Sequence, residues 1–157
     1  MPTGRLPKAV TDGTMAGLLG TAAMSVALLV EIRCTENGSK VVDYDASDHV
    51  VVAASKVLRY SPRSRLGRAA LFQIVHWGYG SLVGIGRVRL GRALPAAAAD
   101  AAFFSGCQAM ALALFPMLGE TPPPWRWRAQ PLVSSFVLHA LYAATVGAVA
   151  RRRAGAR

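Results

Sequence analysis

Four long blocks of apolar residues dominate the chain and give the first prediction of its architecture. None of them contains Lys or Arg, and they cover residues 15–32, 69–86, 95–118 and 131–150. Each has 18 or more residues, whereas a helix needs about 20 apolar residues, and at least about 17, to cross a bilayer. The pattern predicts one all-α membrane domain over residues 1–157, a four-helix transmembrane bundle with helices at 14–33, 68–87, 95–118 and 131–151.

Proline and tryptophan mark the ends of the later blocks. Pro95 and Pro131 open the third and fourth blocks, at positions where a missing backbone N–H costs nothing. Three prolines at 122–124 close the third block. Trp125 and Trp127, each followed by arginine, come next and predict an aromatic anchor at the membrane–water interface.

The only long connection lies between the first and second blocks. Its apolar run at 50–54 precedes Lys56 and Arg59, a pattern that predicts a short amphipathic helix over residues 47–59, lying on the membrane surface. Acidic residues before this run favour a solvated turn and helix cap over a metal cluster, because their spacing fits no calcium loop. The residues concerned are Asp43, Asp45, Asp48 and His49.

The composition excludes the ordinary soluble classes. Hydrophobic residues make up 53% of the chain, charged residues only 17%, and the mean hydropathy is +0.33. The net charge of +10 would suggest nucleic acid in a soluble protein, but the basic residues here flank the apolar blocks. We therefore expect the lipid bilayer as partner, with a homo-oligomer or a larger membrane complex, and no nucleic acid.

The flanking charges predict the orientation. The N-terminus, the second loop and the C-terminus carry nine basic residues packed against helix ends. The opposite side also carries nine, spread over the long first loop and the third loop with five acids. The positive-inside rule counts charges close to helix ends, so both termini are expected in the cytoplasm. The first set comprises Arg5, Lys8, Arg87, Arg89, Arg92, Arg151, Arg152, Arg153 and Arg157.

The blocks also match one another in pairs. His76, Tyr79, Val83 and Gly84 recur 63 residues later as His139, Tyr142, Val146 and Gly147. The first and third blocks match at an offset of 86, through Gly20, Ala23 and Met24 against Gly106, Ala109 and Met110. The pattern predicts two fused helical hairpins, a parallel repeat related by an axis along the membrane normal.

These residues resemble the YagU-like bacterial inner membrane proteins. The resemblance rests on Pro116-Met117-Leu118-Gly119-Glu120-Thr121-Pro122, Trp125, His139, His76 with Gly84, and the small residues Gly17, Gly20 and Ala23. It covers most of the chain but not the first loop. The family has no assigned function, so the resemblance implies a multi-pass protein of the bacterial inner membrane and no catalytic residues.

Two histidines are the main candidates for chemistry. His76 and His139 lie about halfway along their blocks, and ionisable groups at that depth are functional candidates. If the repeat holds, they approach each other across its axis, with Tyr79, Tyr142 and Gln73 one turn away. Three interpretations stay open, with interhelical hydrogen bonding favoured over a proton or solute path and over haem or metal ligation.

Other candidate residues are fewer. Asp100 is the only carboxylate well inside a block, and it is expected to pair with Arg87 or Arg92, or to carry protons. Small residues predict close helix packing at Gly17, Gly20, Gly80, Gly84, Gly106 and Gly147. No nucleophile–base set, phosphate loop or zinc motif is present.

The sequence therefore predicts a non-enzymatic membrane protein that packs or scaffolds within the bilayer, without a cofactor. A transport protein with His76, His139 and Asp100 on its path is the first alternative. A haem- or metal-binding module with the two histidines as ligands is the second.

Overall fold

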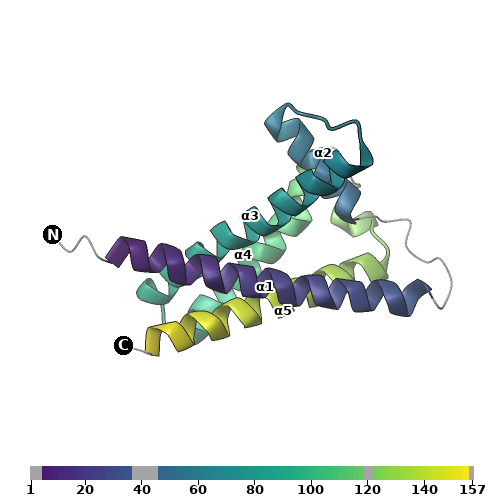
Figure 1. The fold of residues 1–157 in the computed structure, drawn as a ribbon. Coiled ribbons are helices and arrows are strands. Elements are labelled where there is room, and N and C mark those ends of the chain that lie inside the picture. The colour runs from purple at the N-terminus through teal and green to yellow at the C-terminus, as the bar shows by residue number, and fades with distance from the viewer. Residues whose placement is uncertain (1–4, 37–45, 119–121, 156–157) are drawn as a thin grey trace.

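The structure, a computed structural model, describes residues 5–36, 46–118 and 122–155, and this part of the chain is helical without strands (Figure 1). The all-α prediction is confirmed. The elements are α1 (Arg5–Glu36), α2 (Ala46–Leu58), α3 (Arg65–Ala93), α4 (Ala96–Met117), the short 3-10 helix η1 (Pro124–Arg126) and α5 (Ala129–Gly155).

The long helices extend beyond the apolar blocks that predicted them. The helix expected at 14–33 covers Arg5–Glu36, and that expected at 68–87 covers Arg65–Ala93. Helical hydrogen bonding continues through charged residues until a cap or a proline stops it. For α3 the cap is Ser64, whose side chain accepts a hydrogen bond from Gly67 N at 3.0 Å.

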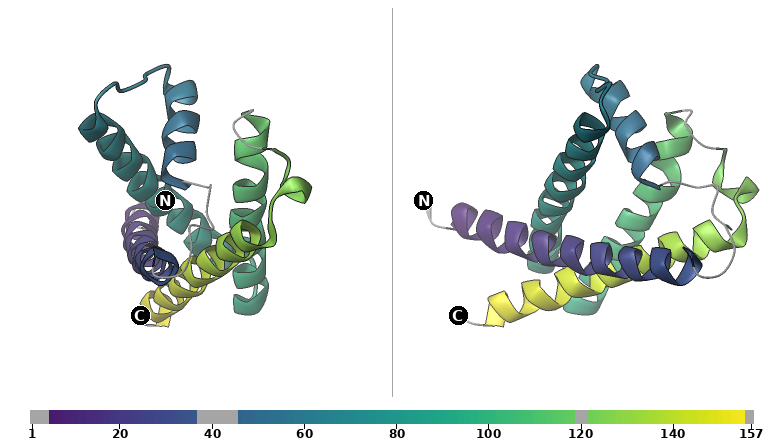
Figure 2. Two further views of the ribbon diagram at one scale, coloured as in Figure 1. Left: turned by 90° about the vertical axis from the view of Figure 1, so that its right-hand side faces the viewer. Right: turned by 45° about the vertical axis from the view of Figure 1, so that its right-hand side comes forward.

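The four long helices meet at one end of the molecule and diverge toward the other. α1 packs along both α3 and α5, and α1 and α5 run in opposite directions, so the start of α1 and the end of α5 lie together (Figure 1). α3 and α4 lean away from this pair as they leave the shared end (Figure 2). We call the shared end, which holds the start of α1, the end of α3, the start of α4 and the end of α5, the closed end.

Large apolar side chains cover much of the exterior, and the interior combines apolar clusters with small and polar residues. Large side chains such as Val26, Ile74 and Leu82 are 61%, 71% and 69% exposed. The buried residues include Thr21 and Arg87 together with several alanines. So many exposed apolar side chains are unusual for a water-soluble protein and are typical of a helical bundle whose solvent is lipid.

Three helices are long and apolar enough to cross a membrane: 8–34 in α1, 96–114 in α4 and 129–155 in α5. The second block, inside α3, does not reach the same hydropathy. Gln73, His76 and the glycines of α3 lower its mean hydropathy. Length and composition therefore support three of the four predicted spans.

The predicted surface helix is present as α2, but its environment differs from the expectation. Val51 and Ala54 are buried and cluster with Leu71 of α3, so these apolar residues pack on protein, whereas Val57 and Leu58 are exposed. The Lys56 Nζ donates a hydrogen bond to the carbonyl of Leu118 at 2.7 Å, which ties α2 to the end of α4. The side chains of the acidic cluster at 43–49 lie outside the described residues.

Candidate functional site: polar groups between the helices

α1 and α3 cross with their backbones in contact. A Cβ added at Gly84 would lie 2.7 Å from the Cα of Gly17, and one added at Gly17 would lie 2.8 Å from the Cα of Ser81. The side chain of Thr21, itself buried, fills the space beside Gly80. Glycine at 17, 80 and 84 is what allows this approach, which brings the polar residues of both helices to the same interface.

The other three predicted packing glycines differ among themselves. A Cβ at Gly20 would meet the ring of Tyr142 at 2.9 Å, and one at Gly147 would meet Asp100 Cγ at 3.2 Å. Gly106 lies on the exposed side of α4, and a Cβ there would meet nothing within 4 Å in the described structure. The packing expected at Gly106 is therefore not found within the bundle.

His76 is joined to α1. Its Nε2 lies 3.1 Å from Ser25 Oγ, and its ring stacks on Phe72 with centroids 5.2 Å apart. The Gln73 side chain, one turn earlier, is exposed and accepts a hydrogen bond from Trp77 Nε1 at 2.9 Å. The serine gives His76 a partner on the neighbouring helix, which the sequence offers no signal to find.

His139 is joined to residues of α5 and α4. Its Nδ1 lies 2.7 Å from the carbonyl oxygen of Ser135 and 3.5 Å from Ser135 Oγ, which also accepts from Gln108 Nε2 at 3.5 Å. Each imidazole thus bonds a serine, and in the described part of the chain neither bonds the other. The expected approach of the two histidines therefore stays a prediction, and α3 and α4 lean away from α1 and α5 (Figure 2).

The two matched tyrosines lie in different environments. Tyr142 is 5% exposed, and its hydroxyl donates to the carbonyl of Gly80 at 2.6 Å, linking α5 to α3. Tyr79 is 43% exposed. Glycine at position 80 has no side chain to cover its carbonyl, so the Tyr142 hydroxyl can reach it. Gly80 therefore contributes both to the packing of α1 on α3 and to the link between α3 and α5.

Replacing Tyr142 with phenylalanine tests this link. We expect Tyr142→Phe to lower the free energy of unfolding by about 1 kcal/mol, since it deletes one buried hydrogen bond and leaves a carbonyl without its donor. Unfolding would be followed by circular dichroism in mixed micelles. The matched control is Tyr79→Phe, and equal losses in the two variants would contradict the role of the Tyr142 hydroxyl.

Asp100 holds two arginines at the closed end. It accepts hydrogen bonds from Arg87 Nε at 3.0 Å and Nη2 at 2.6 Å, and it also pairs with Arg151. The Arg87 side chain is only 2% exposed. Arg87 is a partner that the sequence predicts for Asp100. Arg151, on α5, is a second partner that the sequence did not predict.

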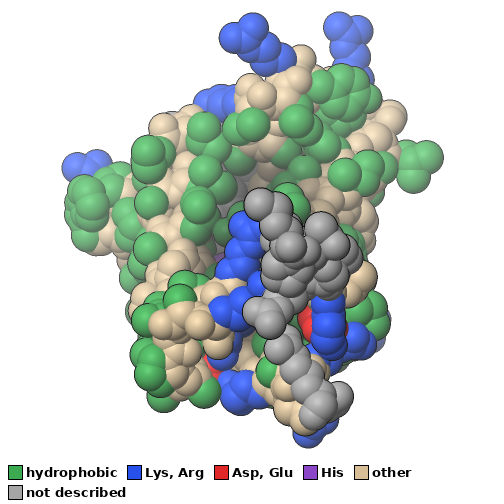
Figure 3. Space-filling model, turned by 90° about the vertical axis from the view of Figure 1, so that its left-hand side faces the viewer, with side chains coloured by type: hydrophobic (Ala, Val, Ile, Leu, Met, Phe, Trp, Pro, Cys, Tyr) green, Lys and Arg blue, Asp and Glu red, His purple; other side chains and the backbone are tan. Residues whose placement is uncertain are grey.

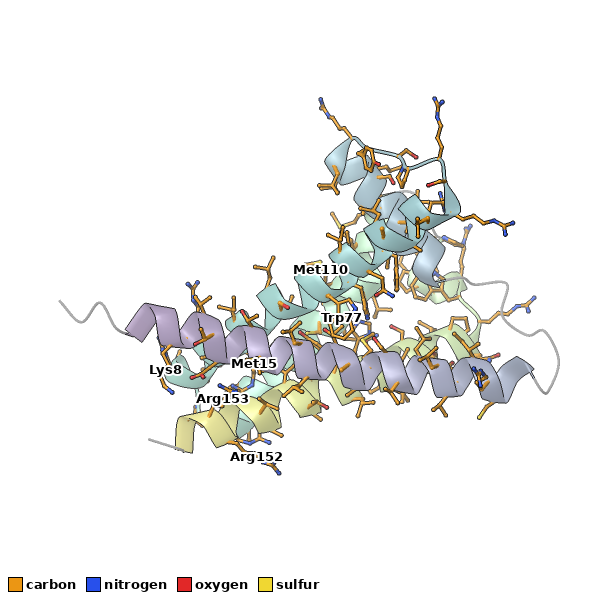
Figure 4. The ribbon with its side chains drawn as sticks, viewed as in Figure 1. Lys8, Met15, Trp77, Met110, Arg152 and Arg153 are labelled. Atoms are coloured by element: carbon orange, nitrogen blue, oxygen red, sulfur yellow. The ribbon has the colours of Figure 1, made fainter. Side chains whose placement is uncertain are left out.

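A second ion-pair group lies beside it. Asp12 pairs with Lys8 at 3.3 Å and with Arg153 at 3.2 Å, joining α1 to α5. Lys8 and Arg153 lie at the same end of the ribbon (Figure 4), and Lys and Arg side chains gather over this end in the space-filling view (Figure 3). The i,i+4 spacing of Lys8 and Asp12 was a sequence signal for part of this group.

Neither of two clefts in the described part of the chain reaches the histidines. One groove of about 340 Å³ lies between α4 and α5, with Asp100 and Arg151 at one end. A second cleft of about 530 Å³ lies between α1 and α5, lined in part by Glu31 and Ser134, whose side chains are hydrogen-bonded at 2.7 Å. His76 and His139 line neither. Among the described residues no three His, Cys, Asp or Glu side chains are grouped as metal ligands.

Polar side chains therefore connect helices throughout this bundle. Ser25 with His76, Gln108 with Ser135, and Tyr142 with Gly80 each join two different helices. In comparisons with known proteins, no protein-family model, no curated protein and no solved structure matches this chain.

Proposed function

We propose that this chain is a non-enzymatic integral membrane protein that packs within the bilayer as a scaffold or as a subunit of a larger complex. The observation that carries the proposal is an apolar exterior on the long helices combined with polar links between them. Large apolar side chains such as Leu29 and Leu82 face outward, while the hydrogen bonds and ion pairs connect the helices to one another. Lipid is the solvent in which that arrangement is stable.

α3 is the fourth span in this proposal. The Asp12–Arg153 pair and the Arg87–Asp100 pair gather four helix ends at the closed end. If α1 crosses the membrane away from this end and α4 crosses starting from it, then the chain between them must return across the bilayer, and α3 is the helix that does so. Its lower hydropathy is tolerable because its glycine face is covered by α1.

We also keep the duplicated-hairpin hypothesis and the YagU-like resemblance as proposals. α1 with α3 and α4 with α5 are both antiparallel pairs (Figure 1), and Gly84 and Gly147, which match at the repeat offset, both lie against the other helix of their pair. The resemblance would place the protein in the bacterial inner membrane. Unequal burial of Tyr79 and Tyr142 marks where the halves have diverged.

Cysteine labelling tests the topology, with both termini in the cytoplasm. Cys34 is exposed near the end of α1 and Cys107 is buried. In intact cells, a membrane-impermeant maleimide should label Cys34 in a Cys107→Ala background. An Arg152→Cys probe at the closed end, in a chain lacking both native cysteines, should react only after permeabilisation. Labelling in the opposite order would reverse the proposed orientation, and labelling of both probes in intact cells would contradict an even number of spans.

Two measurements separate the proposal from its competitors. In proteoliposomes, we expect no more proton flux than in empty vesicles, because both histidines are bonded to serines and line neither cleft. Flux that His76→Ala or His139→Ala abolishes would establish the transport hypothesis instead. The purified protein is also expected to be colourless, and a Soret band lost in the double histidine variant would establish haem ligation.

A further inference from the structure

The groove between α4 and α5 has two chemically different parts. Its floor is apolar and made of small residues, including Ala140, Ala143 and Ala144, with Phe104 and Phe136 beside them. Its mouth is formed by Asp100 and Arg151 at the closed end. From Arg151 to Phe136 the groove follows α5 for about 22 Å, at 1.5 Å per residue. An apolar slot of that length with a charged mouth is shaped for an amphipathic molecule.

The charge at the mouth is positive. Asp100 is shared by Arg87 and Arg151, which leaves a surplus of one positive charge in this group. α4 begins here behind Pro95, without a side-chain cap, so the positive end of its helix dipole faces the same region. Around the closed end the described helices carry eight basic residues against Asp12 and Asp100. They are Arg5, Lys8, Arg87, Arg89, Arg92, Arg151, Arg152 and Arg153.

We propose that this groove binds one anionic phospholipid, with a fatty acyl chain along the alanine floor and the phosphate at Arg151. The inference rests on the proposed membrane embedding and adds a ligand to it. A phosphodiester carries one negative charge and so matches the surplus at the mouth. Basic pockets between transmembrane helices on the cytoplasmic side recognise anionic headgroups in this way, and the closed end is the proposed cytoplasmic side.

Native mass spectrometry of the full-length purified protein tests the site. The probes are dioleoyl phosphatidylglycerol and dioleoyl phosphatidylcholine, which share acyl chains and differ in net charge. We expect one phosphatidylglycerol retained per chain, and weaker retention of phosphatidylcholine. Ala144→Phe fills the groove at a residue that is itself exposed, and it should reduce phosphatidylglycerol retention to the phosphatidylcholine level. The control is Ala101→Phe, at an exposed α4 position that does not line the groove.

A charge variant gives an independent readout. Arg151→Gln should weaken phosphatidylglycerol binding about fivefold, the effect of about 1 kcal/mol per basic residue near an anionic lipid, and leave phosphatidylcholine binding unchanged. Arg128→Gln removes the same charge at the other end of α5 and should bind like the parent chain. Equal retention of the two lipids, or unchanged binding in both Ala144→Phe and Arg151→Gln, would overturn the lipid site.

Carbonate extraction of cell membranes tests membrane embedding separately from the lipid site. A chain released by carbonate would defeat the membrane proposal and the lipid site together. A chain that stays in the membrane but binds both lipids equally defeats the lipid site alone.

Discussion

Gly84→Ala should destabilise the protein by about 3 kcal/mol, the upper part of the range for overpacking a filled site. The added methyl group would meet the Cα and N of Gly17 at 2.7 Å. Backbone atoms cannot turn aside as a flexible side chain can, so α1 and α3 must separate. The free energy of unfolding in mixed micelles, followed by circular dichroism, measures the loss.

Gly86→Ala is the matched control, two residues along the same helix. A Cβ at Gly86 would meet nothing within 4 Å in the described structure. This variant should therefore raise stability by less than about 1 kcal/mol, because alanine favours the helix more than glycine does. If both variants lose stability equally, then glycine matters here for the helix itself and not for the α1–α3 contact.

Asp100→Asn should be the most damaging substitution among the charged residues. It leaves Arg87, whose side chain is 2% exposed, buried without a counter-charge, and breaking such a pair costs about 3–5 kcal/mol. Partial exposure of Asp100 at 36% places the expected loss near the lower end of that range. The same unfolding measurement applies.

A double variant distinguishes charge pairing from simple loss of contacts. Arg87→Met with Asp100→Asn removes both charges and keeps a long apolar side chain at 87, so it should recover most of the stability lost in Asp100→Asn. A double variant that is less stable than Asp100→Asn would show that Arg87 stabilises the closed end through contacts other than its ion pair.

The apolar blocks predicted the helices because transmembrane length is a strong constraint that acts within a single segment. Gly17, Gly80 and Gly84 were recognisable for the same reason, since small residues at i,i+4 spacing form one helix face. The hydrogen-bond partners of the polar groups were not recognisable from the sequence. Ser25 lies 51 residues from His76, and nothing local in the sequence marks a serine as the residue opposite a histidine.

The repeat predicts equivalent surroundings for His76 and His139, and the contacts of the two hairpins differ in detail. The contact between α1 and α3 is closed by glycines on both helices, whereas α4 presents Phe103, Cys107 and Asp100 toward α5. α4 therefore meets α5 through side chains, whereas α1 meets α3 through backbone atoms. The groove lies between the pair that meets through side chains.

The glycine contact between α1 and α3 has a consequence for how the protein is made. Both partners lie within the first 93 residues, so this hairpin can close in the membrane before α4 and α5 leave the ribosome. Arg87 emerges before its counter-charge, Asp100, which follows 13 residues later. Arg151 and Arg153 complete both ion-pair groups only after α5 has been translated. The order of the chain thus permits stepwise assembly, in which Arg87 and Asp12 each meet a partner that is translated after them.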